Sequence, residues 1–105
     1  MSMKADWYVL PGEFVAASGT VTWDEHTSTY SEIRVLQNRI ILANDESSDV
    51  RVYNMKYIAD VYLYQHSGGT WVITWRESTN VYHTVNVGTN WDWAHQLFYH
   101  IQCRL

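Results

Sequence analysis

Five histidines and one cysteine are the side chains in this sequence best suited to bind a metal ion. Near the C-terminus, His100 and Cys103 are three residues apart, which on a helix separates them by about 60° around the axis, a feasible pair of zinc ligands. A zinc site needs three or four ligands, and the sequence has no Cys-x-x-Cys or His-Glu-x-x-His spacing to supply them. We therefore interpret these residues as polar side chains on the outer side of a helix, and we expect no metal or other cofactor.

No combination of residues predicts covalent or acid–base catalysis. Cys103 lies two residues from the end of the sequence, with no recognisable oxyanion donors beside it. The adjacent acids Asp24-Glu25 and Asp45-Glu46 fall in polar stretches that are typical of solvated turns. Gly68-Gly69 precedes a predicted strand, whereas a phosphate-binding glycine loop precedes a helix. We expect a protein that is not an enzyme.

Composition predicts one packed domain over residues 1–105, because 47% of the residues are hydrophobic and only 17% are charged. Six Trp and eight Tyr make up most of the aromatic content. Seven Lys and Arg are scattered among eleven acids, for a net charge of −4. Nucleic-acid and membrane-surface binding both require clustered basic residues, so neither partner is expected.

The cellular setting expected from the sequence is the cytoplasm. A single cysteine cannot form an internal disulfide, and residues 1–6 lack the apolar segment of a signal peptide. No apolar run is long enough to cross a bilayer. These features also suit a phage or mobile-element protein made inside a bacterial cell.

One segment, at about residues 90–105, has the periodicity of an amphipathic helix. Its apolar residues fall on a stripe roughly 120° wide: Trp91, Ala94, Leu97, Phe98, Ile101 and Leu105. Thr89 or Asn90 can serve as the N-cap, and Arg104 in the last turn complements the helix dipole. This helix must cover a β structure, since the rest of the chain is patterned as strands and turns.

Extended segments are expected from about residue 7 to residue 87. They are 7–10, 13–17, 20–24, 30–36, 39–43, 50–53, 58–65, 70–76 and 81–87, and the breaks between them include Pro11-Gly12, Ser18-Gly19, Gln37-Asn38 and Ser67-Gly68-Gly69. About seven of them are full strands. The predicted fold class is mainly β, within α+β: about seven antiparallel strands in a bent barrel or sandwich, closed by one C-terminal amphipathic helix.

This order of elements resembles the pleckstrin-homology-like superfold. Three segments are similar to its bacterial and GRAM-type members: Leu10-Pro11-Gly12-Glu13-Phe14-Val15, Arg39-Ile40-Ile41-Leu42 and Tyr57-Ile58-Ala59-Asp60-Val61. The resemblance implies a binding or scaffolding domain rather than an enzyme. It does not extend to phosphoinositide binding, because members with that function carry Lys/Arg pairs in the first hairpin, where this sequence has only the isolated Arg34 and Arg39.

The candidate binding surface is one face of the last three strands. If Val61, Leu63, Trp71, Ile73 and Trp75 face the core, the opposite face presents Tyr62, Tyr64, Val72, Thr74 and Arg76, joined by Tyr82 and Thr84. Tyrosine and arginine are enriched in protein interfaces, so Tyr62, Tyr64, Arg76 and Tyr82 are the predicted contact residues. A slip of one residue in register would exchange the two faces.

Three functions remain open on the sequence alone. The first is a non-enzymatic protein-binding or scaffolding module, with a homodimer as one form. The second is a small acidic inhibitor or immunity-type protein, whose Asp45, Glu46 and Asp49 would mask a basic surface of a toxin or nuclease. The third is a small-ligand binder that uses stacked Trp and Tyr side chains.

Overall fold

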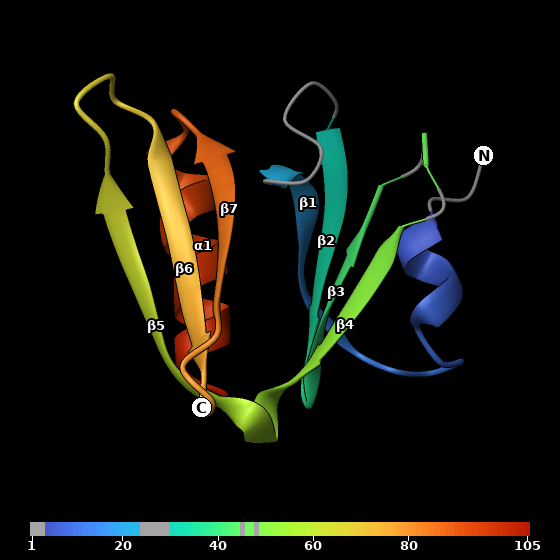
Figure 1. Ribbon diagram of the computed structural model, residues 1–105. Helices are drawn as coiled ribbons and strands as arrows, with labels where there is room; N and C mark the ends of the chain where they lie inside the picture. Colours follow the sequence, from blue (N-terminus) through green and yellow to red (C-terminus); the bar gives the residue numbers. More distant parts are fainter. Residues whose placement is uncertain (1–3, 24–29, 45, 48) are drawn as a thin grey trace.

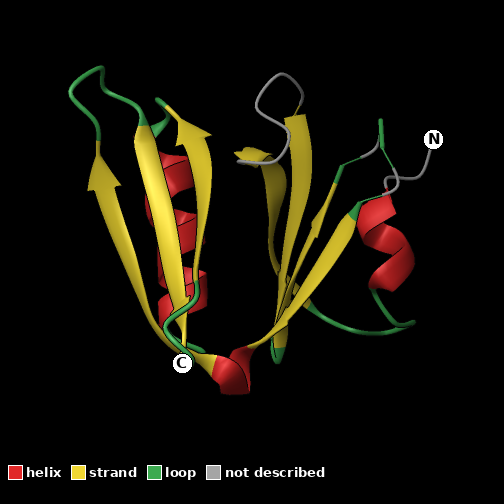
Figure 2. Cartoon of the chain, in the orientation of Figure 1, coloured by secondary structure: helices red, strands yellow, loops and turns green. Residues whose placement is uncertain are grey.

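Most of the chain forms a single antiparallel sheet with one helix packed against it. The computed structural model describes residues 4–23, 30–44, 46–47 and 49–105. The strands are β1 (Val15–Trp23), β2 (Tyr30–Leu36), β3 (Arg39–Ala43), β4 (Val50–Asn54), β5 (Ile58–Gln65), β6 (Trp71–Glu77) and β7 (Tyr82–Gly88). The helical segments are the 3-10 helices η1 (Lys4–Tyr8) and η3 (Met55–Tyr57) and the α-helix α1 (Trp91–Gln102) (Figures 1 and 2). The predicted class, seven antiparallel strands followed by one C-terminal helix, is confirmed.

The strands follow the order β4-β3-β2-β1-β7-β6-β5, and the sheet bends between β1 and β7. In the part of the chain that the structure describes, those two strands are paired only at Thr22–Asn86 and Trp23–Val85, so the sheet consists of two halves, β1–β4 and β5–β7, which meet over a short contact. Among the described residues the edge strands β4 and β5 are connected through η3 and are not paired with each other. The sheet is therefore not a closed barrel, and its bent, two-part form is consistent with a sandwich.

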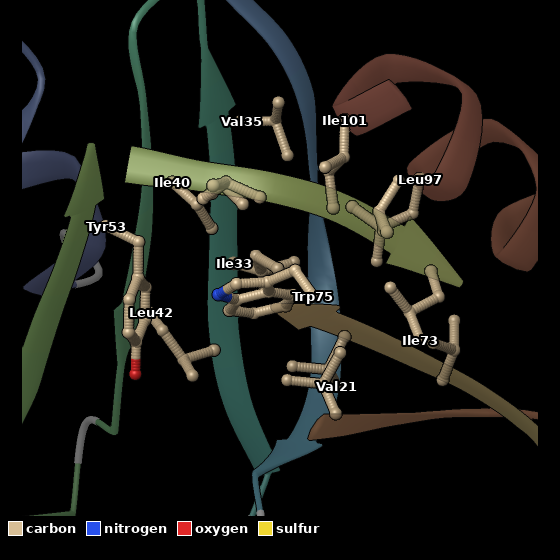
Figure 3. Packing of buried hydrophobic residues seen from close by; sticks show 14 of the residues in the cluster. Val21, Ile33, Val35, Ile40, Leu42, Tyr53, Ile73, Trp75, Leu97 and Ile101 are labelled. Carbon is tan, nitrogen blue, oxygen red and sulfur yellow. The ribbon is translucent and has the colours of Figure 1, made fainter. Parts of the chain in front are cut away.

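The main core lies between the two halves of the sheet and α1. Both halves contribute apolar side chains, among them Val21, Ile33, Leu42 and Ile73, and Trp75 is fully buried at the centre (Figure 3). Burying one side chain the size of Val, Leu or Ile stabilises the folded state by about 1.5–3 kcal/mol. The alternation of β5 and β6 predicted this core face correctly, with Val61 buried and Leu63 and Trp71 packed against the cluster.

Helix α1 begins at the cap Asn90, whose side-chain oxygen accepts a hydrogen bond from the backbone N–H of Trp93. Ala94, Leu97 and Ile101 are fully buried, as predicted. The predicted stripe is wrong at its ends, because Trp91 is 58% exposed and Leu105 is 45% exposed. The buried face is rotated toward Trp93, whose indole ring packs on β1, while Trp91 stacks on His95 at a ring distance of 3.9 Å.

A second, smaller apolar cluster covers the other face of the β2–β3 hairpin. Leu36, Ile41 and Ala43 are buried there beneath Ala5 of η1. The prediction that residues 7–10 form an extended run is wrong, since the segment is the end of a 3-10 helix followed by a turn. Leu36 and Ile41 interrupt the alternation of their strands because this hairpin is buried on both faces.

Two arginines hold the N-terminal segment in place. Arg34 is 7% exposed, and its guanidinium donates hydrogen bonds to Asp6 Oδ1 at 2.9 Å and Glu32 Oε2 at 3.2 Å. Burial by itself would lower the pKa of Arg34, but these two carboxylates outweigh it and the pKa is raised. Arg39 pairs with Glu13 and donates to the backbone oxygen of Tyr8 at 2.7 Å. Both arginines therefore have structural partners within the chain.

Strand β1 is continuous through Ser18-Gly19, where the sequence predicted a break. The prediction is wrong because Gly19 faces the helix: a Cβ at this position would lie 2.6 Å from Cζ2 of Trp93. The glycine makes room for an aromatic ring and does not end the strand. The turns predicted at Gln37-Asn38 and Ser67-Gly68-Gly69 both separate paired strands, as expected.

Candidate functional site

The register of β5, β6 and β7 places the predicted contact residues on one side of the sheet, opposite α1. In one row across the three strands, Asp60 lies opposite Arg76 and Arg76 lies opposite Tyr82. In the next row, Tyr62 lies opposite Thr74 and Thr74 lies opposite Thr84. Figure 1 shows α1 behind these strands, so the opposite face is turned toward the viewer. We call the surface formed by Tyr62, Tyr64 and Tyr82 the tyrosine face; these side chains are 45%, 43% and 59% exposed.

Arg76 forms a two-point ion pair across the first row of the tyrosine face. Its Nε lies 3.0 Å from Asp60 Oδ1 and its second terminal nitrogen lies 2.9 Å from Asp60 Oδ2. The remaining terminal nitrogen donates to Asn80 Oδ1 at 2.9 Å. Hydrogen bonding to Arg76 lowers the pKa of Asp60, and the same bond raises the pKa of Arg76. The pair thus leaves this part of the surface electrically balanced.

The central strand β6 forms the buried base of the tyrosine face. Val72 and Thr74 share this face as predicted, but they are 2% and 8% exposed because the flanking strands cover them. The Thr74 hydroxyl lies 3.0 Å from the Thr84 hydroxyl and 3.4 Å from the Tyr64 hydroxyl. These hydrogen bonds join all three strands, so the tyrosine side chains project from an ordered base.

The predicted acidic tract lies on the other half of the sheet. Asp45 is outside the described residues, Glu46 is exposed, and Asp49 is partly buried. Asn44 organises this segment: its side-chain oxygen accepts hydrogen bonds from the backbone N–H groups of Glu46 and Ser47. The segment connects β3 to β4, so it is not brought together with the tyrosine face, and the acidic-inhibitor hypothesis remains a prediction.

The two candidate metal ligands on α1 interact with neighbouring groups of the same helix end. The Cys103 thiol lies 3.7 Å from the backbone oxygen of His100, and Arg104 donates to the Cys103 sulfur at 3.1 Å. Within the described part of the chain, no three His, Cys, Asp or Glu side chains come together as a metal site would require.

A pocket of about 190 Å³ opens between the two halves of the sheet, a feature that sequence reasoning missed. Five aromatic side chains line it, from Trp23, Tyr53, Trp75, Tyr82 and His83, and we call it the aromatic pocket. The remaining lining residues are Leu42, Arg51, Thr84 and Val85. Alternation placed Trp23 and Trp75 in the core correctly, but it carries no signal for a space between strands that are distant in sequence.

The rings of the aromatic pocket contact one another at defined angles. Tyr53 lies 4.4 Å from His83 and meets Trp75 edge to face at 5.2 Å, measured between ring centroids. His83 Nε2 lies 3.0 Å from Glu77 Oε2, and Arg51 lies 5.5 Å from the centre of a Trp23 ring. The indole Nε1 of Trp75 is buried, and no hydrogen-bond partner for it lies within the part of the chain that the structure describes.

None of the helices in the described part of the chain is both long enough and apolar enough to cross a membrane. The sequence matches no model of a known protein family, and no curated protein matches it.

Proposed function

We propose that this chain is a non-enzymatic protein-binding module with a pleckstrin-homology-like architecture, and that the tyrosine face is its contact surface. The order of seven antiparallel strands and one C-terminal helix supports the architecture expected from the resemblance. A single, exposed Cys103 supports the cytoplasmic setting, since a reducing compartment keeps such a thiol free.

The observation that carries the proposal is the exposure of three tyrosines on one rigid face. Tyrosine offers a large contact area and loses little conformational freedom when it is buried, which is why it is common in interface hot spots. The hydrogen-bonded row formed by Tyr64, Thr74 and Thr84 orders this surface before any partner arrives. Binding to a preorganised surface has a smaller entropic cost.

The charges in the structure favour a protein over a phosphoinositide as the partner. Arg34 and Arg39, the isolated basic residues of the first hairpin, are held by Asp6, Glu32 and Glu13. A phosphate group would have to compete with these carboxylates for the guanidinium groups. The tyrosine face itself contains the balanced Asp60–Arg76 pair, so no concentrated positive charge is available there.

A second copy of the chain is the partner to test first. The chain has a net charge of −4, which opposes association of two copies, but the balanced Asp60–Arg76 pair limits repulsion where two tyrosine faces meet. In a two-fold dimer the same surface meets itself, and this one combines apolar rings with paired charges. Among the described residues β5 pairs only with β6, so its outer edge can also add to the interface.

Light scattering across a concentration series tests the proposal. We expect a dimer for the native chain and for Tyr99→Ser, which removes a 62% exposed tyrosine on α1, and a monomer for Tyr62→Ser combined with Tyr64→Ser. The melting temperature of the double variant should remain close to that of the native chain.

A native chain that is monomeric at every concentration would rule out self-association. A photo-crosslinker placed at position 62, compared with one at position 99, then tests a foreign partner. Crosslinking that is equally efficient from both positions would contradict a role for the tyrosine face.

A further inference from the structure

We infer that the aromatic pocket binds a small planar aromatic molecule carrying a hydrogen-bond acceptor, such as a carbonyl or carboxylate group. The pocket adjoins the tyrosine face at Tyr82, but Tyr62 and Tyr64 do not line it. Its walls come from both halves of the sheet: Trp23 on β1 and Tyr53 on β4 face Trp75 on β6 and His83 on β7. The floor is buried, and the exposed side chains of Arg51 and Tyr82 stand at the rim.

The size of the pocket limits the ligand to about one ring with a small substituent. Its volume is about 190 Å³, whereas pockets for drug-sized molecules measure roughly 300–1,000 Å³. An apolar cavity of about 150 Å³ is large enough for benzene. A ring with a carboxylate or amide group therefore matches the space between the two halves.

The walls favour a flat, aromatic ligand. The rings of Tyr53, Trp75 and His83 contact one another at tilted or edge-to-face angles, with centroids 4.4–6.0 Å apart. Aromatic rings pair with further rings in the same offset and edge-to-face geometries. His83 is held through its Nε2 by Glu77 at 3.0 Å, which orients the imidazole as part of the wall.

The Trp75 indole N–H is the reason why the ligand should carry a hydrogen-bond acceptor. Trp75 is 0% exposed, and among the described residues its indole nitrogen has no hydrogen-bond partner. Figure 3 shows the nitrogen end of the indole turned toward Tyr53 and Leu42, which both line the pocket. The ring face of Tyr53 is a weak acceptor, and a buried donor without a full hydrogen bond carries a free-energy cost. An oxygen atom of the ligand would remove this cost.

The experiment is a titration of the intact ¹⁵N-labelled chain, observed through its Trp indole N–H signals. The probes are benzoate and benzamide, which carry an acceptor, and toluene, which does not. We expect the Trp75 signal, assigned from its loss in Trp75→Phe, to shift and saturate with the first two probes. Toluene should bind at least about tenfold more weakly, since it leaves the donor unsatisfied. Trp91, stacked on His95 at the surface, provides an internal control whose signal should stay in place.

The inference is overturned if the Trp75 signal does not move with benzoate and benzamide, if toluene binds as well as they do, or if Trp91 responds equally. Should Trp75→Phe fail to fold, Trp→Phe variants at the other five Trp positions identify the Trp75 signal by elimination, and the three probes are still compared on the native chain. Tyr62→Ser combined with Tyr64→Ser should leave the titration unchanged, so loss of dimerisation and loss of ligand binding are distinguishable.

Discussion

The indole ring of Trp93 on α1 packs directly over Gly19 in the middle of β1. A Cβ atom at position 19 would lie 2.6 Å from Cζ2 and 2.8 Å from Cη2 of that ring. The Trp93 Nε1 also donates a hydrogen bond to the backbone oxygen of Thr20 at 3.2 Å. This contact connects the C-terminal helix to the first strand, and it requires a residue without a side chain at position 19.

Replacing Gly19 with Ala should therefore destabilise the fold. The added methyl group meets the Trp93 ring, which its hydrogen bond to the Thr20 oxygen holds over position 19, and overpacking of this kind costs about 1–3 kcal/mol. The free energy of unfolding from urea denaturation measures the effect. Gly68→Ala is the matched control, because a Cβ at Gly68 has no atom within 4 Å. Equal stability of the two variants would show that the ring moves away freely.

Replacing Asn90 with Ala should weaken the start of α1. The Asn90 side chain accepts a hydrogen bond from the Trp93 N–H at 3.0 Å, and loss of such a cap costs about 0.5–2 kcal/mol. Thr89→Ala, one residue earlier and exposed, should change the free energy of unfolding by no more than about 0.5 kcal/mol. Chemical denaturation followed by far-UV circular dichroism measures both. A larger loss of stability for Thr89→Ala than for Asn90→Ala would show that Thr89, and not Asn90, caps the helix.

Replacing Asp60 with Asn should make the fold less sensitive to acid. Hydrogen bonding to Arg76 lowers the pKa of Asp60 from its ordinary 3.8. A carboxyl group whose pKa is lower in the folded chain than in the unfolded chain stabilises the folded state at pH values above the unfolded-state pKa. This contribution is lost as the pH falls through the folded-state pKa. The native chain should thus lose stability below about pH 4 more steeply than the variant.

Denaturation at a series of pH values measures this difference. Glu46→Gln, which changes an exposed acid in the β3–β4 connection, is the comparison for a general change in charge. If Asp60→Asn keeps the full acid dependence of the native chain, the ion pair does not contribute to it.

The sequence was informative wherever one face of an element is buried and the other is not. Alternation in β5 separated Val61 and Leu63 from Tyr62 and Tyr64, and the structure places each pair on the predicted side. It failed where both faces are buried, as for Leu36 and Ile41 in the first hairpin. Alternation reports a difference between two faces, so a strand covered on both sides gives no contrast.

In helix α1, too, the sequence pattern alone did not identify every core residue. Its period correctly selected Ala94, Leu97 and Ile101, but it ranked Trp91 above Trp93 as a core residue. Both are large and apolar, and they differ by about 160° around the axis. Only the position of Gly19, distant in sequence, determines that Trp93 has a place to pack.

By itself the sequence determined the order of the elements, the turns that separate most of the strands, and the side of β5–β7 on which the tyrosines lie, because these depend on local chain chemistry. The tertiary structure decided which charges cancel and where space remains. Asp60 meets Arg76 across two strands, and Trp23, Tyr53, Trp75 and His83 surround one pocket from four strands. The physical reason is that ion pairs and cavities arise from distances between residues far apart in the chain, and periodicity along the chain does not encode those distances.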